Sequence, residues 1–117
     1  MRNATFPDIL ISAQIVVTCS LSDSGCQGGD SKNAFQYVNY HIKKKILEKN
    51  ITDETCAIYE AKGRNEGLEC NEMSICKNCM PNKGCWAQEK AKVYGIQEYG
   101  VVNGETQMMN EIYTRGP

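Results

Sequence analysis

Cysteine spacing constrains the fold of this chain more than any other feature of its sequence. Seven cysteines occur in 117 residues, and five of them lie in the segment from Cys56 to Cys85. Cysteines at this density are typical of proteins that mature in an oxidising compartment and are rare in cytosolic enzymes. The odd number implies that intrachain bridges cannot include all of them. We therefore expect a disulfide-rich domain in which residues 50–88 form irregular loop held by cross-links.

Length, composition and charge predict one globular domain with a modest core. Apolar residues make up 41% of the chain, too many for a disordered chain. The net charge of −1 argues against nucleic acid or an anionic membrane as the main partner. No apolar run approaches the roughly 20 residues that span a bilayer. Two glycosylation sequons, at Asn3 and Asn50, are weak signals that agree with secretion. Residues 1–5 lack the pattern of a signal peptide, so we expect the chain to be a piece of a longer protein.

Apolar periodicity predicts a long helix from Ser31 to about Lys45. Its apolar stripe consists of Ala34, Phe35, Val38 and Ile42. A final helix should begin after Asn103, which we expect to cap it, and should end at Gly116-Pro117. The face that this final helix is expected to bury consists of Met108, Met109, Ile112 and Tyr113.

Two further segments are less regular. Residues 9–17 are predicted to be helical, although Ile15-Val16-Val17 would also suit a strand. Residues 91–102 are rich in strand-forming side chains and should be extended, with Gly95 and Gly100 interrupting or bending the strand.

Two cysteine patterns suggest chemistry, but neither is complete. A zinc site would have to use the group Cys70, Cys76, Cys79 and Cys85. This group holds a single Cys-x-x-Cys pair, whereas structural zinc usually takes two well-separated pairs, so we favour disulfides and expect no metal or cofactor. Gly84-Cys85-Trp86-Ala87 is similar to the end of a papain-type nucleophile motif, but too few residues follow it to build the long helix that such a thiolate needs.

His41 is the one histidine and hence the sole candidate base for a cysteine nucleophile. It lies on the predicted long helix near Lys43–Lys45, where we expect it to face solvent. The sequence therefore contains no complete catalytic set.

Residues 25–31, which we call the glycine turn, follow Cys19 closely. Adjacent Gly28 and Gly29 allow positive φ and a close approach of another chain. Asp30-Ser31 can then cap the long helix. From the residues alone, a simple turn into the helix is favoured over a ligand-binding turn, and both interpretations stay open.

Gly25-Cys26-Gln27-Gly28-Gly29, preceded by Val16-Val17-Thr18-Cys19, resembles the papain-like cysteine peptidases. Within that family the sequence is similar to that of the cathepsin Z (cathepsin X) group at Asp53-Glu54-Thr55-Cys56 and in the cysteine-rich segment 70–85. Met108-Met109-Asn110-Glu111-Ile112-Tyr113 also matches that group. The resemblance covers essentially the whole chain. The stretch between Cys56 and Cys70 departs from it by being several residues longer.

The resemblance implies an α+β, partial papain-like fold. Residues 1–90 would be part of the left, helical and disulfide-rich domain without its central helix, and residues 91–117 would start the right β-barrel domain. The chain would then be a fragment of a lysosomal or extracellular cysteine carboxypeptidase. The family's nucleophile, base and orienting asparagine have no matching position here, so we expect no catalytic residue and no activity from the chain alone.

The resemblance also implies roles for individual residues. Contact with a peptide or protein substrate would come from Gly28, Gly29, Asp30 and Ser31. Disulfides would pair Cys19–Cys70, Cys56–Cys76 and Cys79–Cys85. Cys26 would stand outside these bridges, as a reactive thiol or as the link in a dimer. The alternative function is a non-catalytic secreted module that binds peptides or inhibitors through the glycine turn.

Overall fold

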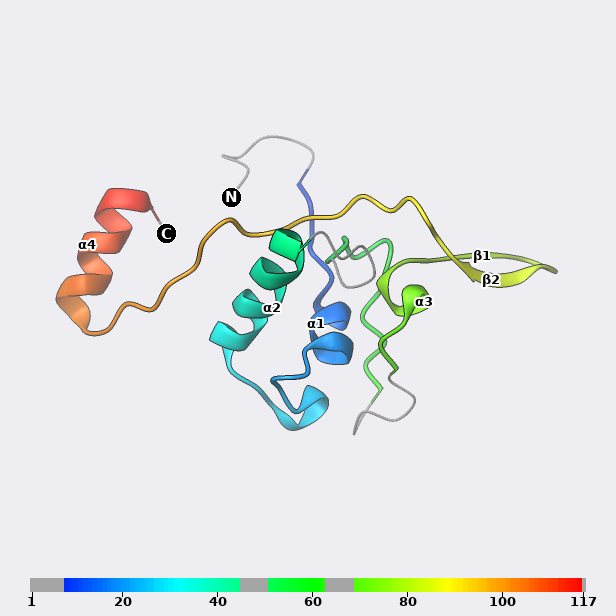
Figure 1. Cartoon of the computed structure of the whole chain (residues 1–117), viewed down its shortest axis with the longest axis horizontal. Helices are drawn as coiled ribbons and strands as arrows, with labels where there is room; N and C mark the ends of the chain where they lie inside the picture. Colours follow the sequence, from blue (N-terminus) through cyan, green and yellow to red (C-terminus); the bar gives the residue numbers. More distant parts are fainter. Residues whose placement is uncertain (1–7, 45–50, 63–68, 117) are drawn as a thin grey trace.

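The computed structural model describes residues 8–44, 51–62 and 69–116. Along the chain the elements are α1 (Ala13–Cys19), a 3-10 turn η1 (Gly25–Gln27), α2 (Ser31–Lys44), α3 (Glu72–Ile75), β1 (Lys77–Met80), β2 (Gly84–Ala87) and α4 (Glu105–Arg115). The molecule is elongated, with extents of 57 × 34 × 27 Å. In Figure 1 the helices α1, α2 and α3 form the middle, while the β1–β2 hairpin and α4 lie at opposite ends. This mixture of helices with one small antiparallel sheet agrees with the expected α+β class.

A small core joins segments that are distant in sequence. Its buried members are Ile15, Cys19, Tyr37, Val38, Ile51, Ala57 and Ile75. They come from α1, α2, the segment 51–57 and the end of α3. Ile15 is completely buried, and nearby Thr52 donates its hydroxyl to the Ile75 carbonyl oxygen at 2.7 Å. The core thus depends on the cysteine-rich segment as much as on the helices.

Helix α1 begins later than the apolar pattern predicts. Ser12 caps it by accepting a hydrogen bond from the Ile15 N–H, and residues before Ser12 are extended, with Ile11 bridged to Asp53. The Ser12 N–H donates to the Thr52 carbonyl oxygen at 3.0 Å. The predicted helix is therefore confirmed for its second half, including the β-branched run Ile15-Val16-Val17, while residues 9–12 pair with the segment 51–57.

The long helix is confirmed as α2. Val38 is buried within the core, whereas Phe35, which shares its predicted stripe, is half exposed. On the same helix the buried Asn39 donates its side-chain amide to two carbonyl oxygens, those of Ile96 at 2.9 Å and Gln97 at 2.8 Å. Helix α2 thereby holds the extended segment 94–97 against the core.

Residues 91–102 contain less strand than the sequence predicts. Their one β-bridge in the described structure pairs Tyr94 with Ile51. Gly95 directly follows this bridge, and residues 95–102 form no strand. The Ile96 and Gln97 carbonyls bond to the Asn39 side chain in place of a neighbouring strand.

The cysteine-rich segment is more regular than expected. A capping box between Asn71 and Ser74 starts the short helix α3. An antiparallel hairpin follows, in which Lys77 pairs with Ala87 and Cys79 with Cys85. The prediction of irregular loop for residues 50–88 is therefore wrong for residues 72–87.

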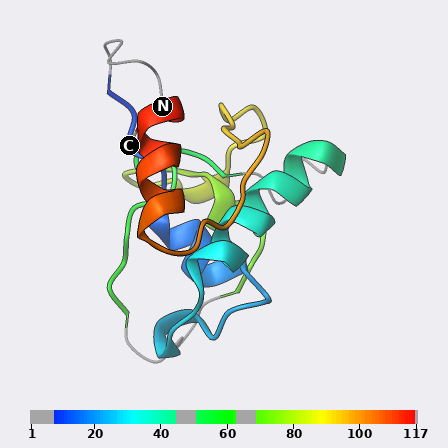
Figure 2. The ribbon, with the colours of Figure 1, turned by 90° about the vertical axis from the view of Figure 1, so that its left-hand side faces the viewer.

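Helix α4 is correctly predicted, but its burial and cap are not. The expected buried face is 47–93% exposed, with Tyr113 the most exposed of its side chains. Gly104 occupies the cap position, and the Asn103 N–H donates instead to the Gln107 side chain at 3.2 Å. Figure 2, viewed from the side of α4, shows this helix in front of the other elements. Periodicity identified residues that share a face, but in this chain the core lies elsewhere.

None of the helices in the described ranges has the length and apolar content required to cross a membrane.

Candidate functional site

The glycine turn is closed by its own backbone. The Gln27 N–H donates to the Ser24 carbonyl oxygen at 3.0 Å, and the Ser24 N–H donates to that of Gly28 at 2.9 Å. The Gly28 N–H donates to the Gly25 carbonyl oxygen at 3.3 Å. Both backbone groups of Gly28 are therefore used inside the turn.

The two glycines are required for different reasons. Gly28 has φ +120°, a region that disfavours other residues, and a Cβ on it would meet nothing within 4 Å. Gly29 does not have positive φ. A Cβ on Gly29 would lie 2.6 Å from Asp23 Oδ1 and 2.9 Å from Asp23 Cβ, so a side chain there would collide with Asp23.

Asp23 connects the residue that follows α1 to the start of α2. Its Oδ1 accepts from the Asp30 N–H at 2.9 Å and from Asn33 Nδ2 at 3.0 Å, and its Oδ2 accepts from the Ser20 hydroxyl at 2.7 Å. These hydrogen bonds, led by that from the Asp30 N–H, lower the pKa of Asp23 below its usual value. No pattern considered in the sequence singles out this residue. A carboxylate between Cys19 and the adjacent glycines was the available signal, because Asp commonly bonds to nearby backbone in turns.

Asp30 and Ser31 begin α2 as expected. The Asp30 carboxylate accepts from the Lys32 N–H at 2.8 Å, as an N-cap side chain does. The Asp30 carbonyl oxygen accepts from the N–H groups of Asn33 and Ala34. Gly28, Gly29, Asp30 and Ser31 all lie exposed on this one turn.

Gly29 differs from its neighbours in its backbone groups. Within the described part of the chain, the structure gives no hydrogen-bond partner to the Gly29 N–H or C=O, while Gly28 and Asp30 both use theirs. An exposed residue with both groups available can exchange two hydrogen bonds with an extended chain, as paired residues of antiparallel strands do. The turn can therefore bind a peptide backbone through Gly29.

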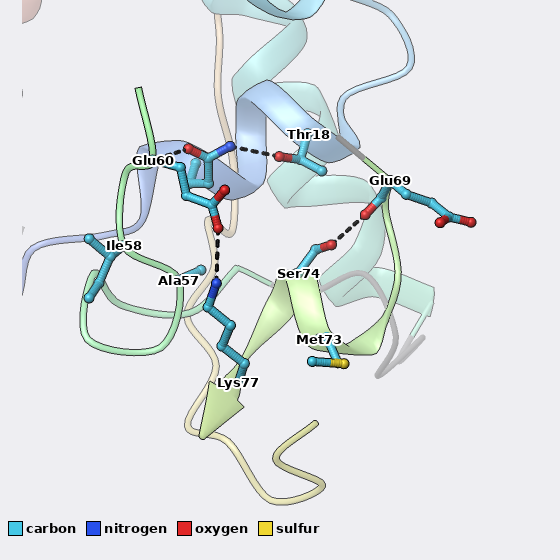
Figure 3. A pocket seen from close by; sticks show the side chains of 9 residues that line it. Thr18, Ala57, Ile58, Glu60, Glu69, Met73, Ser74 and Lys77 are labelled. Atoms are coloured by element: carbon cyan, nitrogen blue, oxygen red, sulfur yellow. Dashed lines mark hydrogen bonds and ion pairs between the residues drawn. The ribbon is translucent and has the colours of Figure 1, made fainter. Parts of the chain in front are cut away.

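A pocket also lies between α1, the segment 57–60 and α3 (Figure 3). Its polar groups bond to one another. Gln14 donates to the Thr18 hydroxyl at 2.9 Å and accepts from the Glu60 N–H at 2.8 Å, and the Glu60 carboxylate pairs with Lys77 at 2.9 Å. We assign this pocket a structural role, because the side chains of Gln14, Glu60 and Lys77 are already partnered.

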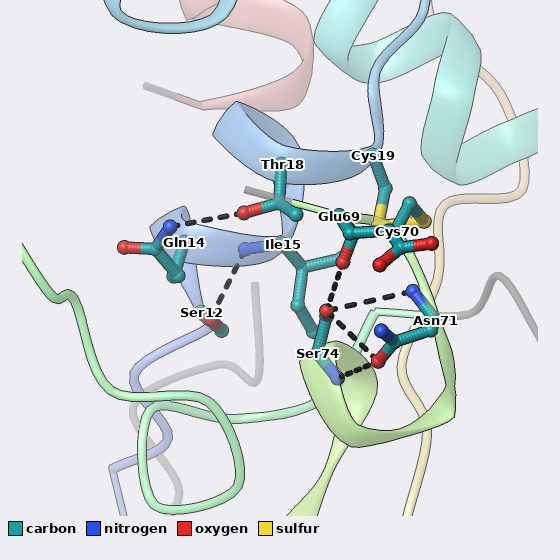
Figure 4. The surroundings of a disulfide bond; sticks show 9 residues. All are labelled: Ser12, Gln14, Ile15, Thr18, Cys19, Glu69, Cys70, Asn71 and Ser74. Carbon is teal, nitrogen blue, oxygen red and sulfur yellow. Dashed lines mark hydrogen bonds between the residues drawn. A yellow bond between two sulfur atoms is a disulfide. The ribbon is translucent and has the colours of Figure 1, made fainter. Parts of the chain in front are cut away.

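Three disulfides hold the segments around the turn: Cys19–Cys70, Cys56–Cys76 and Cys79–Cys85. They are the same pairs that the resemblance implies. Figure 4 shows Cys19, at the end of α1, joined to Cys70 beside the Asn71–Ser74 cap. The bridge therefore fixes the start of the loop that leads into the glycine turn.

The model of the papain family of cysteine proteases matches residues 2–117. The chain belongs to this family. It is 27% identical over 113 residues to cathepsin B of Dictyostelium discoideum, a match that covers 94% of this chain and 34% of that protein. The chain thus spans about a third of the length of the curated relative that it matches. These comparisons support the papain family and do not single out its cathepsin Z group.

Of the catalytic candidates weighed in the sequence of this papain-family chain, Cys85 is not available as a nucleophile. Cys85 lies in β2 and is bonded to Cys79, so it is not a thiolate at the start of a helix. The side chain of His41 lies outside the described residues, as do Asn3 and Asn50, the two candidate glycosylation sites. In the described ranges no group of three or more His, Cys, Asp or Glu side chains is arranged to hold a metal ion.

Cys26 lies on the glycine turn and is exposed. Its thiol donates to the Lys62 carbonyl oxygen at 3.3 Å. The reactivity of Cys26 and its role as the link in a dimer stay predictions. The division of the chain into two domains at residue 90 also stays a prediction.

Proposed function

We propose that this chain is part of a papain-family cysteine peptidase and supplies one edge of its substrate cleft. The observation that carries the proposal is Gly29, whose exposed N–H and C=O lack partners in the described structure although both neighbours use theirs. Binding through backbone groups would accept many side chains, since main-chain hydrogen bonds give affinity in strand-like peptide recognition. Asp30 and Ser31 would flank the bound peptide at the start of α2.

The chemistry of such a peptidase is thiolate attack on the peptide carbonyl, acyl-enzyme formation and hydrolysis. We assign none of these steps to a residue of this chain. Cys85 is held in a disulfide, and no other residue here matches the family's nucleophile, base or orienting asparagine. The contribution of the chain is then substrate binding alone.

The parent protein is, in this proposal, a lysosomal or extracellular carboxypeptidase similar to cathepsin Z. The proposal is supported by the sequence resemblance at residues 53–56, in the cysteine-rich segment 70–85 and at residues 108–113. The three disulfides fit an oxidising compartment. The relative at 27% identity is a cathepsin B, which makes a cathepsin B-like parent the competing assignment.

Peptide titration followed by NMR tests the binding edge. The probe is a capped peptide of alternating valine and alanine, and the amides of Gly28, Gly29 and Asp30 should show the largest shifts. The matched control is the same peptide with N-methylated backbone amides, which cannot donate to the Gly29 carbonyl. Equal shifts from both peptides, or shifts confined to other parts of the chain, would refute the proposal.

An activity assay tests the absence of catalysis. We expect no turnover of a fluorogenic peptide at acid pH under reducing conditions. Turnover that disappears in Cys85→Ser would show that Cys85 is a nucleophile after all.

A further inference from the structure

We propose that Asp23 is a positioning residue for peptide binding at the glycine turn, because its carboxylate sets the direction of the Gly29 carbonyl. The inference rests on the proposed function of the glycine turn and adds to it a residue outside that turn. Three features support it: the shared peptide unit of residues 29 and 30, the anchoring of Asp23, and the close packing of Asp23 against Gly29.

The peptide unit between Gly29 and Asp30 transmits the effect. Its N–H belongs to Asp30 and donates to Asp23 Oδ1 at 2.9 Å. A peptide unit is planar and almost always trans, so its carbonyl points opposite to its N–H. Because Asp23 binds the N–H, the Gly29 carbonyl is directed away from Asp23. The same bond prevents the Asp30 N–H from competing for a bound peptide.

Asp23 can set this direction because it is itself anchored at both helix ends. Ser20, which follows α1 and is buried, donates its hydroxyl to Asp23 Oδ2 at 2.7 Å. Asn33, in the first turn of α2, donates to Asp23 Oδ1 at 3.0 Å and to the Ser22 carbonyl oxygen at 3.2 Å. The adjacent Cys19–Cys70 bridge fixes the end of α1.

Close packing explains why residue 29 lacks a side chain. The position of a Cβ on Gly29 is occupied by the Asp23 side chain, with three atoms of Asp23 within 2.9 Å of it. A larger residue at 29 would displace Asp23 and break its bond to the Asp30 N–H. A bound peptide cannot use that space either, so contact is left to the backbone groups of Gly29.

The test uses the oxidised full chain with the capped valine–alanine peptide. In wild type the Asp30 amide should be protected from hydrogen exchange although the turn is exposed. Asp23→Ala should remove this protection and weaken peptide binding about tenfold, because binding must then order a peptide unit that Asp23 no longer holds. Asp23→Asn keeps an oxygen acceptor in the same place and should restore most of the affinity, which a purely electrostatic role would not allow.

Asp53→Ala is the matched control. Asp53 also accepts from a backbone N–H and a hydroxyl, both of Thr55, and lies outside the glycine turn. Its replacement should leave peptide affinity and the Asp30 amide unchanged. A loss of affinity equal to that of Asp23→Ala would reduce Asp23 to a general contributor to stability.

The possible outcomes separate the two proposals. If wild type binds no peptide, the proposed function fails, while Asp30 protection that depends on Asp23 would still support the positioning of the carbonyl. If Asp23→Ala binds as tightly as wild type, or if the wild-type Asp30 amide exchanges like that of an unstructured chain, the role of Asp23 is refuted. Should Asp23→Ala fail to fold, hydrogen exchange of the wild-type Asp30 amide and the peptide affinity of Asp23→Asn still test the role of Asp23.

Discussion

Ser12 shows how much one residue contributes to this small fold. It is completely buried, its hydroxyl donates to the Ala57 carbonyl oxygen at 2.6 Å, and the same oxygen caps α1 at the Ile15 N–H. Ser12→Ala would leave a buried carbonyl without its donor and remove the cap. We expect the free energy of unfolding to fall by about 1–3 kcal/mol, measured by urea denaturation. Ser22→Ala, at an exposed position, is the control, and an equal loss in both variants would contradict the argument.

Glu60 gives the chain a pH dependence. Hydrogen bonds from Lys62 and then Lys77 lower the pKa of Glu60 from 4.5 to about 2. A carboxylate with a lowered pKa stabilises the folded state above its unfolded pKa, and this contribution is lost as pH falls through the folded pKa. The stability difference between wild type and Glu60→Gln should therefore narrow between about pH 4.5 and 2. The difference should be small, because exposed ion pairs contribute little. Urea midpoints across this range would show it, and a constant difference would refute the role of the pairs.

At the scale of elements, Asn39 determines where the segment 94–97 lies. Its amide bonds to the carbonyls of Ile96 and Gln97, next to the bridge between Tyr94 and Ile51. Asn39→Ala should lower the free energy of unfolding by about 1–3 kcal/mol. It should also speed hydrogen exchange of the Tyr94 amide, which donates to the Ile51 carbonyl. The exposed Asn110→Ala in α4 is the control, and unchanged Tyr94 exchange in Asn39→Ala would show that the segment docks without Asn39.

At the scale of the whole molecule, the disulfides rank by the loops they close. Cys19–Cys70 joins residues 51 apart, Cys56–Cys76 joins residues 20 apart and Cys79–Cys85 joins residues 6 apart. By chain entropy, removing the first should cost about 4 kcal/mol and removing the last about 2 kcal/mol. Thermal melts of Cys19→Ala/Cys70→Ala and Cys79→Ala/Cys85→Ala would measure this. A larger loss from the hairpin bridge would mean that its local geometry matters more than loop closure.

Helix α4 contributes no residue to the described core of the molecule. Its apolar side chains are exposed, and it lies at one end of an elongated molecule (Figure 1). The chain spans about a third of its curated relative, and its described core is confined to α1, α2, the segment 51–57 and α3. Most of the stability should therefore come from that core and from the disulfides.

The sequence by itself determined the features that depend on near neighbours. Periodicity predicted α2, and Gly116 was correctly placed at the end of α4. The cysteine pattern predicted a disulfide-rich domain, and the motif Gly25–Gly29 identified the papain family that the family model then matched. Helical periodicity and short motifs depend on residues a few positions apart, so the sequence alone reveals them.

Only the tertiary structure decided which residues form hydrogen bonds across long separations. Ser12 bonds to Ala57 across 45 positions, and Asn39 bonds to Ile96 across 57. No local pattern specifies such pairs, nor does one reveal that the apolar face of α4 is exposed. Asp23 and Gly29 are nearer in sequence, but their contact depends on how the loop after Cys19 folds back onto α2. The sequence shows a glycine at position 29, and the structure supplies the physical reason for it. The space that a Cβ would need is filled by the Asp23 side chain, whose carboxylate orients the peptide unit between Gly29 and Asp30.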